Sequence, residues 1–201
     1  MNENSPKVEL YWDVGSTNTY FALKLLEPIL ERNGATLVLE PFNLGHVFRV
    51  HNYVLMDEPA AKIENRKRDL VRWAEKYQLP FRFPSVFPIK TSRVLRGSLA
   101  MRKWGLEKAY VDAVMAAYWE RDDSSIVEYA GLRHIVRDLG VDVDEFETAS
   151  ESQEIRDQLA ACTNRGLERG VFGVPSLLVN GELFWGKDRM EFVEDELRRS
   201  R

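Results

Sequence analysis

The sequence predicts an α/β fold in which strand and helix patterns at both ends of the chain enclose a long helical stretch. Residues 7–42 show strand, helix and strand in succession, which is the pattern of a βαβ unit. Residues 170–201 show two short strands joined at an Asn-Gly pair and then a helix, a ββα pattern. Residues 43–169 show helical spacing and almost no strand signal. We therefore expect one domain over residues 1–201, with an all-helical insertion at about 43–169.

The N-terminal part begins with a strand at 7–14, where apolar and polar residues alternate and β-forming side chains dominate. From Thr19 the apolar spacing becomes helical, and Asn33-Gly34 ends the helix. A second strand follows at 35–42. A strand, a helix and a strand in so short a stretch form a crossover unit, so the two strands should lie parallel.

The insertion is expected to consist of helices and one ordered loop. Residues 43–58 indicate a loop with a short helix, and Pro59 opens a helix that ends near Tyr77, since proline is tolerated at the first helical position. Three prolines between residues 78 and 89 exclude regular structure there. Further helices are expected at about 91–104, 106–119, 125–139, 143–149 and 151–169, with Ser124-Ser125 and Ser150 as candidate N-caps and Gly140 as a helix end.

The C-terminal part is defined by its turn residues. Val174-Pro175 enters an apolar run, and because proline has no N–H for a central strand, Pro175 should stand at the beginning of that strand. The peptide bond before it is a candidate cis bond, since X–Pro bonds reach the cis form at modest cost. Asn180-Gly181 predicts a tight hairpin to the last strand.

Composition excludes several classes of function. Hydrophobic residues at 44% and charged residues at 30% are ordinary for a globular protein. The net charge of -4 gives no electrostatic basis for binding nucleic acid, and three His with one Cys leave little room for a metal site. No apolar run approaches the roughly 18 residues that span a membrane, and the polar start is unlike a signal peptide. We expect a cytoplasmic protein, and the single Cys162, which cannot form an internal disulfide, fits a reducing compartment.

Four stretches carry short motifs: residues 13–20 read D-V-G-S-T-N-T-Y, 62–73 read K-I-E-N-R-K-R-D-L-V-R-W, 172–175 read F-G-V-P and 185–189 read W-G-K-D-R. In this order they resemble the 2-hydroxychromene-2-carboxylate isomerase and kappa-class glutathione transferase family, in the DsbA-like branch of the thioredoxin superfamily. The resemblance covers nearly the whole chain. It implies a thioredoxin-like fold, βαβ…ββα, with an inserted all-helical subdomain, and an enzyme that uses glutathione.

The first turn of the first helix is the expected centre of the chemistry. Disulfide oxidoreductases of this superfamily have Cys-x-x-Cys there, whereas this chain has Ser16-Thr17-Asn18-Thr19 and therefore cannot exchange electrons through two cysteines. A serine hydroxyl can donate a hydrogen bond to a thiolate supplied by a ligand, and the positive end of the helix dipole stabilises that charge. The resemblance implies that Ser16 is the catalytic residue; the simpler alternative, that Ser16 only caps the helix, stays open and is compatible with it.

The resemblance also implies where glutathione binds. Val174 would pair its backbone with the cysteinyl unit. The γ-glutamyl end would meet Asp188, because a carboxylate accepts charge-assisted hydrogen bonds from an ammonium group. Asp69 would join that end from a partner subunit, since similar enzymes are homodimers. The expected glutathione-binding residues are Ser16, Val174, Pro175, Trp185, Gly186, Lys187, Asp188 and Asp69.

A second group of residues is expected on the side of the second substrate, a small aromatic carboxylate. His46 and Asn52 lie in the loop that contributes to this pocket in similar isomerases, and Lys62 suits an anionic substrate. Each also has a plain alternative, an exposed loop pair for the first two and a solvated helix face for the lysine. The chain departs from the family pattern on this side at Thr17, Asn65 and Lys90.

The resemblance therefore implies a glutathione-dependent isomerase of 2-hydroxychromene-2-carboxylate type, acting in the breakdown of aromatic compounds. Such an enzyme works on an aromatic 2-oxo acid or its hemiketal by reversible addition of a thiolate. Two alternatives remain: a kappa-like glutathione transferase, which consumes glutathione, and a non-catalytic DsbA-like binding module, which does not bind it tightly.

Overall fold

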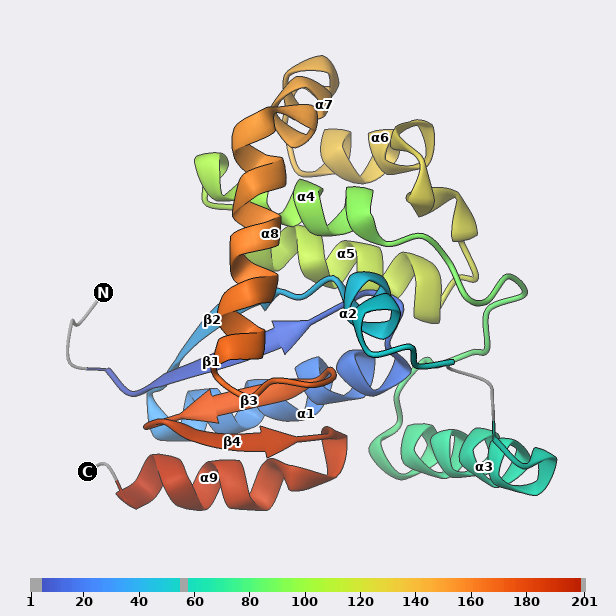
Figure 1. Cartoon of the computed structure of the whole chain (residues 1–201), viewed down its shortest axis with the longest axis vertical. Helices are drawn as coiled ribbons and strands as arrows, with labels where there is room; N and C mark the ends of the chain where they lie inside the picture. The colour runs from blue at the N-terminus through green and yellow to red at the C-terminus, as the bar shows by residue number, and fades with distance from the viewer. Residues whose placement is uncertain (1–4, 55–57, 200–201) are drawn as a thin grey trace.

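The computed structural model describes residues 5–54 and 58–199, and its centre is a mixed four-stranded sheet in the order β2-β1-β3-β4. β1 (Lys7–Trp12) runs parallel to β2 (Thr36–Pro41) and antiparallel to β3 (Ser176–Val179), which pairs with antiparallel β4 (Glu182–Trp185). Leu10 of β1 stands opposite Leu39 and Leu177, so apolar residues fill the middle of the sheet. The predicted βαβ and ββα units are confirmed and share one sheet (Figure 1).

Helices cover both faces of this sheet. α1 (Thr17–Asn33) and α9 (Met190–Arg199) pack together on one face, and α8 (Gln153–Glu168) lies on the other (Figure 1). α8 approaches closely, because a side chain at Gly166 would lie 2.8 Å from the Phe42 ring and 2.9 Å from the Tyr11 ring. α1 ends as predicted at Gly34, whose left-handed backbone, φ 56°, favours glycine.

The insertion is helical, as predicted, and it continues the core of the sheet. Its further helices are α2 (Leu44–Val50), α3 (Ala60–Tyr77), α4 (Ser92–Met101), α5 (Glu107–Trp119), α6 (Tyr129–Asp138) and α7 (Val143–Glu151), with 3-10 turns η1 (Arg102–Trp104) and η2 (Ser124–Val127). Residues 78–90 form the expected irregular loop, and residues 55–57 of the loop expected at 43–58 lie outside the described residues. The Trp119 indole N–H donates to the Val14 carbonyl over 2.8 Å, which joins the insertion to the end of β1.

Three details of the insertion differ from the prediction. The helix expected at 125–139 is split, because Glu128 has an extended backbone between η2 and α6. Asp123 rather than Ser124-Ser125 caps η2, since its carboxylate accepts from the Ser125 N–H over 3.0 Å. Ser150 is a buried residue inside α7, and Ser152 caps α8 instead through a 3.3 Å hydrogen bond from the Ile155 N–H.

Candidate active site

Ser16 stands at the junction of the N-terminal and C-terminal parts of the sheet. It is the N-cap of α1, and its hydroxyl oxygen accepts from the Thr19 N–H over 3.3 Å. The same hydroxyl donates to the Val174 carbonyl over 3.2 Å, across 158 positions of sequence. The N–H groups of Thr17 and Asn18 have no protein acceptor within residues 5–54 and 58–199, as the start of a helix requires. These groups together form a polar, positively polarised end of α1 beside the C-terminal part.

A buried carboxylate holds the turn that leads to Ser16. Asp13 is only 1% exposed, and its Oδ1 accepts from the Gly15 N–H over 2.8 Å. Its Oδ2 accepts from the Leu44 N–H over 3.1 Å and from the Thr91 hydroxyl over 3.0 Å. Burial raises the pKa of Asp13 from 3.8 to about 6, although the three hydrogen bonds act in the opposite direction. Sequence reasoning missed this residue, whose signal was its place at the start of the D-x-x-S motif.

The raised pKa predicts a measurable effect on stability. The folded state keeps the Asp13 proton up to about pH 6, whereas the unfolded chain releases it near 3.8. The contribution of Asp13 to the unfolding free energy is therefore largest below pH 4 and is lost as the pH rises to about 6. Urea unfolding measured across this range should show a smaller fall in Asp13→Asn than in the natural protein, and equal slopes would contradict the assignment.

The Val174-Pro175 segment contacts Ser16 and contains a backbone N–H without an acceptor among the described residues. The bond is cis, as predicted, and Pro175 lies one residue before β3. The Pro175 carbonyl accepts from the Gly186 N–H over 3.0 Å, which fixes this segment against the end of β4. The Val174 N–H has no acceptor among the described residues, although the residue itself is buried. An extended peptide lying here would find one free N–H on the protein.

Aromatic side chains line the far side of this segment. The Phe172 and Trp185 rings lie 5.1 Å apart, and both are exposed. Gly173 admits this contact, since a side chain there would lie 3.1 Å from the Trp185 indole nitrogen. Gly186 has φ 108°, a backbone conformation that favours glycine, and it leads directly into η3 (Lys187–Arg189).

Lys187 forms a small polar cluster with α3. Its ammonium nitrogen lies 3.8 Å from Asp69 Oδ2 and 4.3 Å from the centre of the Trp73 ring, and the side chain is 11% exposed. Burial lowers the pKa of Lys187, while Asp69 and Asp188 oppose that change. Asp69 thus reaches this cluster from the same chain, whereas the resemblance implies a partner subunit as its source. Asp188 is ion-paired with Arg189 over 2.8 Å. The contact of Lys187 with Trp73 was not predicted from the sequence.

The three residues expected around the second substrate have no contact with Ser16 among the described residues. His46 is exposed in the first turn of α2 and lines a hollow of about 220 Å³ against α8. Asn52 is exposed and has a left-handed backbone, φ 51°. Lys62 is 67% exposed and is ion-paired with Glu58 over 2.9 Å. The structure therefore does not bring these three together at one point.

An apolar surface with a cation lies beside the turn before α1. In the loop at 78–90, Phe83 and Phe87 are exposed, and the Phe87 ring lies 6.3 Å from that of Trp119. Lys90 is exposed, forms no ion pair within the described part of the chain, and directly precedes Thr91, the partner of Asp13. Of the other two departures from the family pattern, Thr17 is half-buried in the first turn of α1 and Asn65 is exposed on α3.

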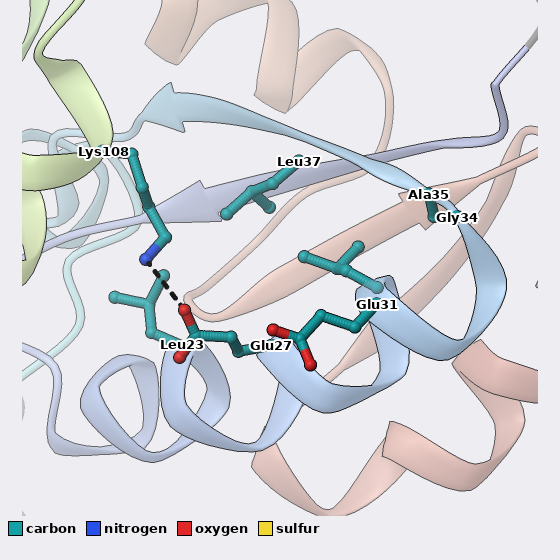
Figure 2. Close-up of a pocket in the computed structure, with 8 residues that line it drawn as sticks. Leu23, Glu27, Glu31, Gly34, Ala35, Leu37 and Lys108 are labelled. Carbon is teal, nitrogen blue, oxygen red and sulfur yellow. Dashed lines mark ion pairs between the residues drawn. The ribbon is translucent and has the colours of Figure 1, made fainter.

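A second hollow, larger than the one beside His46, is not the candidate active site. It measures about 310 Å³ and lies between α1, β2 and α5 (Figure 2). Its lining is apolar at Leu23 and Leu37, and Lys108 points across it towards Glu27 at 4.0 Å (Figure 2). Ser16 does not line it, and Lys108 in the first turn of α5 is already paired with Glu27 and Asp112, so we do not assign the active site to it.

Two other kinds of site find no support in the described residues. Across 5–54 and 58–199, no three His, Cys, Asp or Glu side chains come together to hold a metal ion. No helix in that part of the chain has the length and apolar character to cross a membrane. Cys162 is buried, and burial raises the pKa of its thiol, which makes it a poor nucleophile.

Comparisons with known proteins agree on the fold, and the relatives found include two kinds of enzyme. A family model described as DSBA-like thioredoxin domain matches residues 7–198. The chain is 30% identical to a 2-hydroxychromene-2-carboxylate isomerase of Pseudomonas sp. (strain C18), over 94% of this chain and 88% of the relative. It is 24% identical to glutathione s-transferase kappa 2 of Caenorhabditis elegans, over 96% of this chain and 92% of the relative. A solved structure of a 2-hydroxychromene-2-carboxylate isomerase superposes with a TM-score of 0.84 at 27% identity, covering 96% of this chain and 95% of the other.

Proposed function

This chain belongs to the DSBA-like thioredoxin domain family, and from that premise we propose that it is a glutathione-dependent isomerase of 2-hydroxychromene-2-carboxylate type. The observation that carries the proposal is the replacement of the redox cysteines by Ser16 at the N-terminus of α1, with its hydroxyl directed at Val174. Relatives named as such isomerases align over nearly the whole chain, which supports the reaction class. The proposal includes a homodimer in the cytoplasm and a small aromatic carboxylate as substrate.

The polar groups of the site fit an extended tripeptide thiol. The unpaired Val174 N–H suits the carbonyl of a cysteinyl unit, because an extended peptide pairs through its backbone. Lys187 suits the carboxylate of the γ-glutamyl end, and Asp69 or Asp188 suits its ammonium group. Pro175 and Trp185 would provide apolar contacts to the ligand, and Gly186 would provide a backbone contact. One cation, carboxylate acceptors and a free backbone N–H thus provide partners for the γ-glutamyl end and for the cysteinyl backbone of glutathione.

When bound, glutathione supplies a thiolate that adds reversibly to the electrophilic carbon of the substrate and leaves again unchanged. Ser16 would turn its hydroxyl from the Val174 carbonyl towards the sulfur and donate a hydrogen bond to it. The free N–H groups of Thr17 and Asn18 and the dipole of α1 would favour the charged form of that sulfur. Each of these groups acts more strongly on a thiolate than on a thiol, which is the condition for lowering a thiol pKa.

On the substrate side, we propose that the exposed aromatic residues of the loop at 78–90 meet the aromatic ring and that a lysine meets the carboxylate. Lys62 and Lys90 are the candidates, together with His46 and Asn52 as polar contacts. Lys62 would first have to leave its ion pair with Glu58, whereas Lys90 has no such partner among the described residues. Lys90 also directly precedes Thr91, whose hydroxyl contacts Asp13 in the turn before Ser16, and Lys62 has no such link to this turn in the described part of the chain.

The reaction class is tested by mixing the purified protein with glutathione and 2-hydroxychromene-2-carboxylate. We expect the absorbance of the substrate to change towards the ring-opened isomer only when glutathione is present, with the total free thiol constant throughout. A falling thiol concentration would instead indicate the kappa-like transferase reaction, which the relative named glutathione s-transferase kappa 2 makes the second candidate. If the protein neither converts the substrate nor binds glutathione, the remaining alternative is a non-catalytic DsbA-like binding module.

A further inference from the structure

We propose that Asp13 is a positioning residue, which sets the place of Ser16 and of the first-turn N–H groups of α1 by tying the turn before that helix to two segments of the helical insertion. The inference rests on the proposed function, because it assigns a task to Asp13 within that site. Its independent support is a set of hydrogen bonds that converge on one side chain.

The carboxylate joins three segments that are distant in sequence. Gly15 belongs to the turn itself, Leu44 begins α2, and Thr91 directly precedes α4. The main chain of Asp13 adds a fourth link, since its carbonyl accepts from the Ser16 N–H over 3.0 Å. A movement of the carboxylate would therefore pass to Ser16 through the backbone as well as through Gly15.

The turn has little room in which to move. A side chain at Gly15 would lie 3.1 Å from the Thr91 methyl group and 3.4 Å from Asp13 Oδ1, so the turn packs directly on both residues. The Trp119 indole holds the intervening Val14 carbonyl over 2.8 Å. Contacts from the insertion thus fix successive residues of the turn, and Asp13 makes two of these contacts, with Leu44 and Thr91.

The chemistry of the partners explains why a carboxylate is needed. The two backbone groups can only donate a hydrogen bond, the Thr91 hydroxyl also donates here, and an ionised carboxylate only accepts. An asparagine amide would place its NH₂ against at least one of these donors. Burying a charge without a partner of opposite charge is costly. The basic side chains nearest in the fold, His46 on α2 and Lys90 and Arg93 beside Thr91, do not contribute to the pKa of Asp13. Among the described residues, the hydrogen bonds from Gly15, Leu44 and Thr91 are what favours the ionised form of Asp13.

Two variants separate positioning from charge. Thr91→Val keeps the carboxylate and removes one donor, while Thr91→Ser keeps the donor. If Asp13 positions the site, the ultraviolet absorbance of bound glutathione should show its thiol ionising at a pH about 0.5–1 higher in Thr91→Val, with most of that change restored in Thr91→Ser. Asp13→Asn should lower kcat by about tenfold or more. Asp112→Asn changes a half-exposed carboxylate on α5 and should leave kcat unchanged.

Amide hydrogen exchange of the ligand-free protein gives a second measurement that does not depend on glutathione. In Asp13→Asn, the hydrogen-bonded amides of Gly15, Ser16 and Thr19 should exchange faster while those of β1 stay protected. Unchanged exchange, unchanged thiol ionisation and unchanged kcat in these variants would overturn the inference. If the natural protein binds no glutathione, the proposed function fails, and the exchange experiment alone then decides whether Asp13 positions the turn.

Discussion

Ser16→Ala is expected to lower kcat for the isomerisation by about 10²–10³ while the protein stays folded. The hydroxyl is the side-chain donor that the structure places at the N-terminus of α1, where the thiolate of glutathione would form. A donor aimed at a charge acts mainly on the ionised sulfur, so its loss should raise the pH at which bound glutathione ionises. Stopped-flow turnover and the ultraviolet thiolate absorbance measure the two effects on one sample.

The variant also removes a helix cap, which costs about 0.5–2 kcal/mol on its own. Ser152→Ala is the matched control, because Ser152 caps α8 through the same type of hydrogen bond, 3.3 Å from the Ile155 N–H, and lies outside the site. It should lose comparable stability and keep full turnover. Equal turnover in Ser16→Ala and Ser152→Ala would remove Ser16 from the mechanism.

Lys187→Met is expected to weaken glutathione binding by about 10- to 100-fold, the value of a charge-assisted hydrogen bond in a partly buried site. The methionine retains the apolar contact with Trp73 and removes the charge that would meet the γ-glutamyl carboxylate. Asp69 loses this partner as well, but it keeps Arg72 at 3.9 Å and is 45% exposed, so water can solvate it. Calorimetric titration with glutathione measures the change.

Lys108→Met serves as the control for the loss of one positive charge. Lys108 is also a partly exposed lysine paired with carboxylates, 2.6 Å from Asp112, but it lines the separate hollow of Figure 2. The affinity of Lys108→Met for glutathione should equal that of the natural protein. If both lysine variants bind glutathione as the natural protein does, the γ-glutamyl end does not lie at Lys187.

The sequence was sufficient for the elements whose signals are local and periodic. The alternating strand at the N-terminus, the helix end at Gly34 and the hairpin at Asn180-Gly181 each depend on neighbouring residues, and all are present. Both hairpin residues have positive φ, 52° and 89°, as such a turn requires. The order of the strands in the sheet was not predicted, because no local pattern reveals that β1 lies between β2 and β3.

The errors arose where tertiary packing overrides a local pattern. The apolar spacing of residues 125–139 continues across the break at Glu128, but Gly131 lies so close to Ser125 that a side chain there would come within 2.1 Å of its carbonyl. The cap predicted at Ser150 is instead at Ser152, two residues further along the chain. Only burial, which places Ser150 within α7, distinguishes them.

The candidate site was predictable only in part. Ser16 and Val174 come from two motifs, and the structure places them in contact. Asp13 was missed although it begins the D-x-x-S motif, because the motif does not show that this carboxylate is buried among three donors. The contact between Lys187 and Trp73 joins distant parts of the chain, and neither residue type predicts it.

The central claim is that this chain borrows its reactive sulfur from glutathione at the N-terminus of α1. Titration of the natural protein with glutathione, followed by calorimetry and by thiolate absorbance, tests it most directly. We predict saturable binding of one glutathione per chain with release of the thiol proton near neutral pH. Absence of binding, or binding without ionisation of the thiol, would contradict the account.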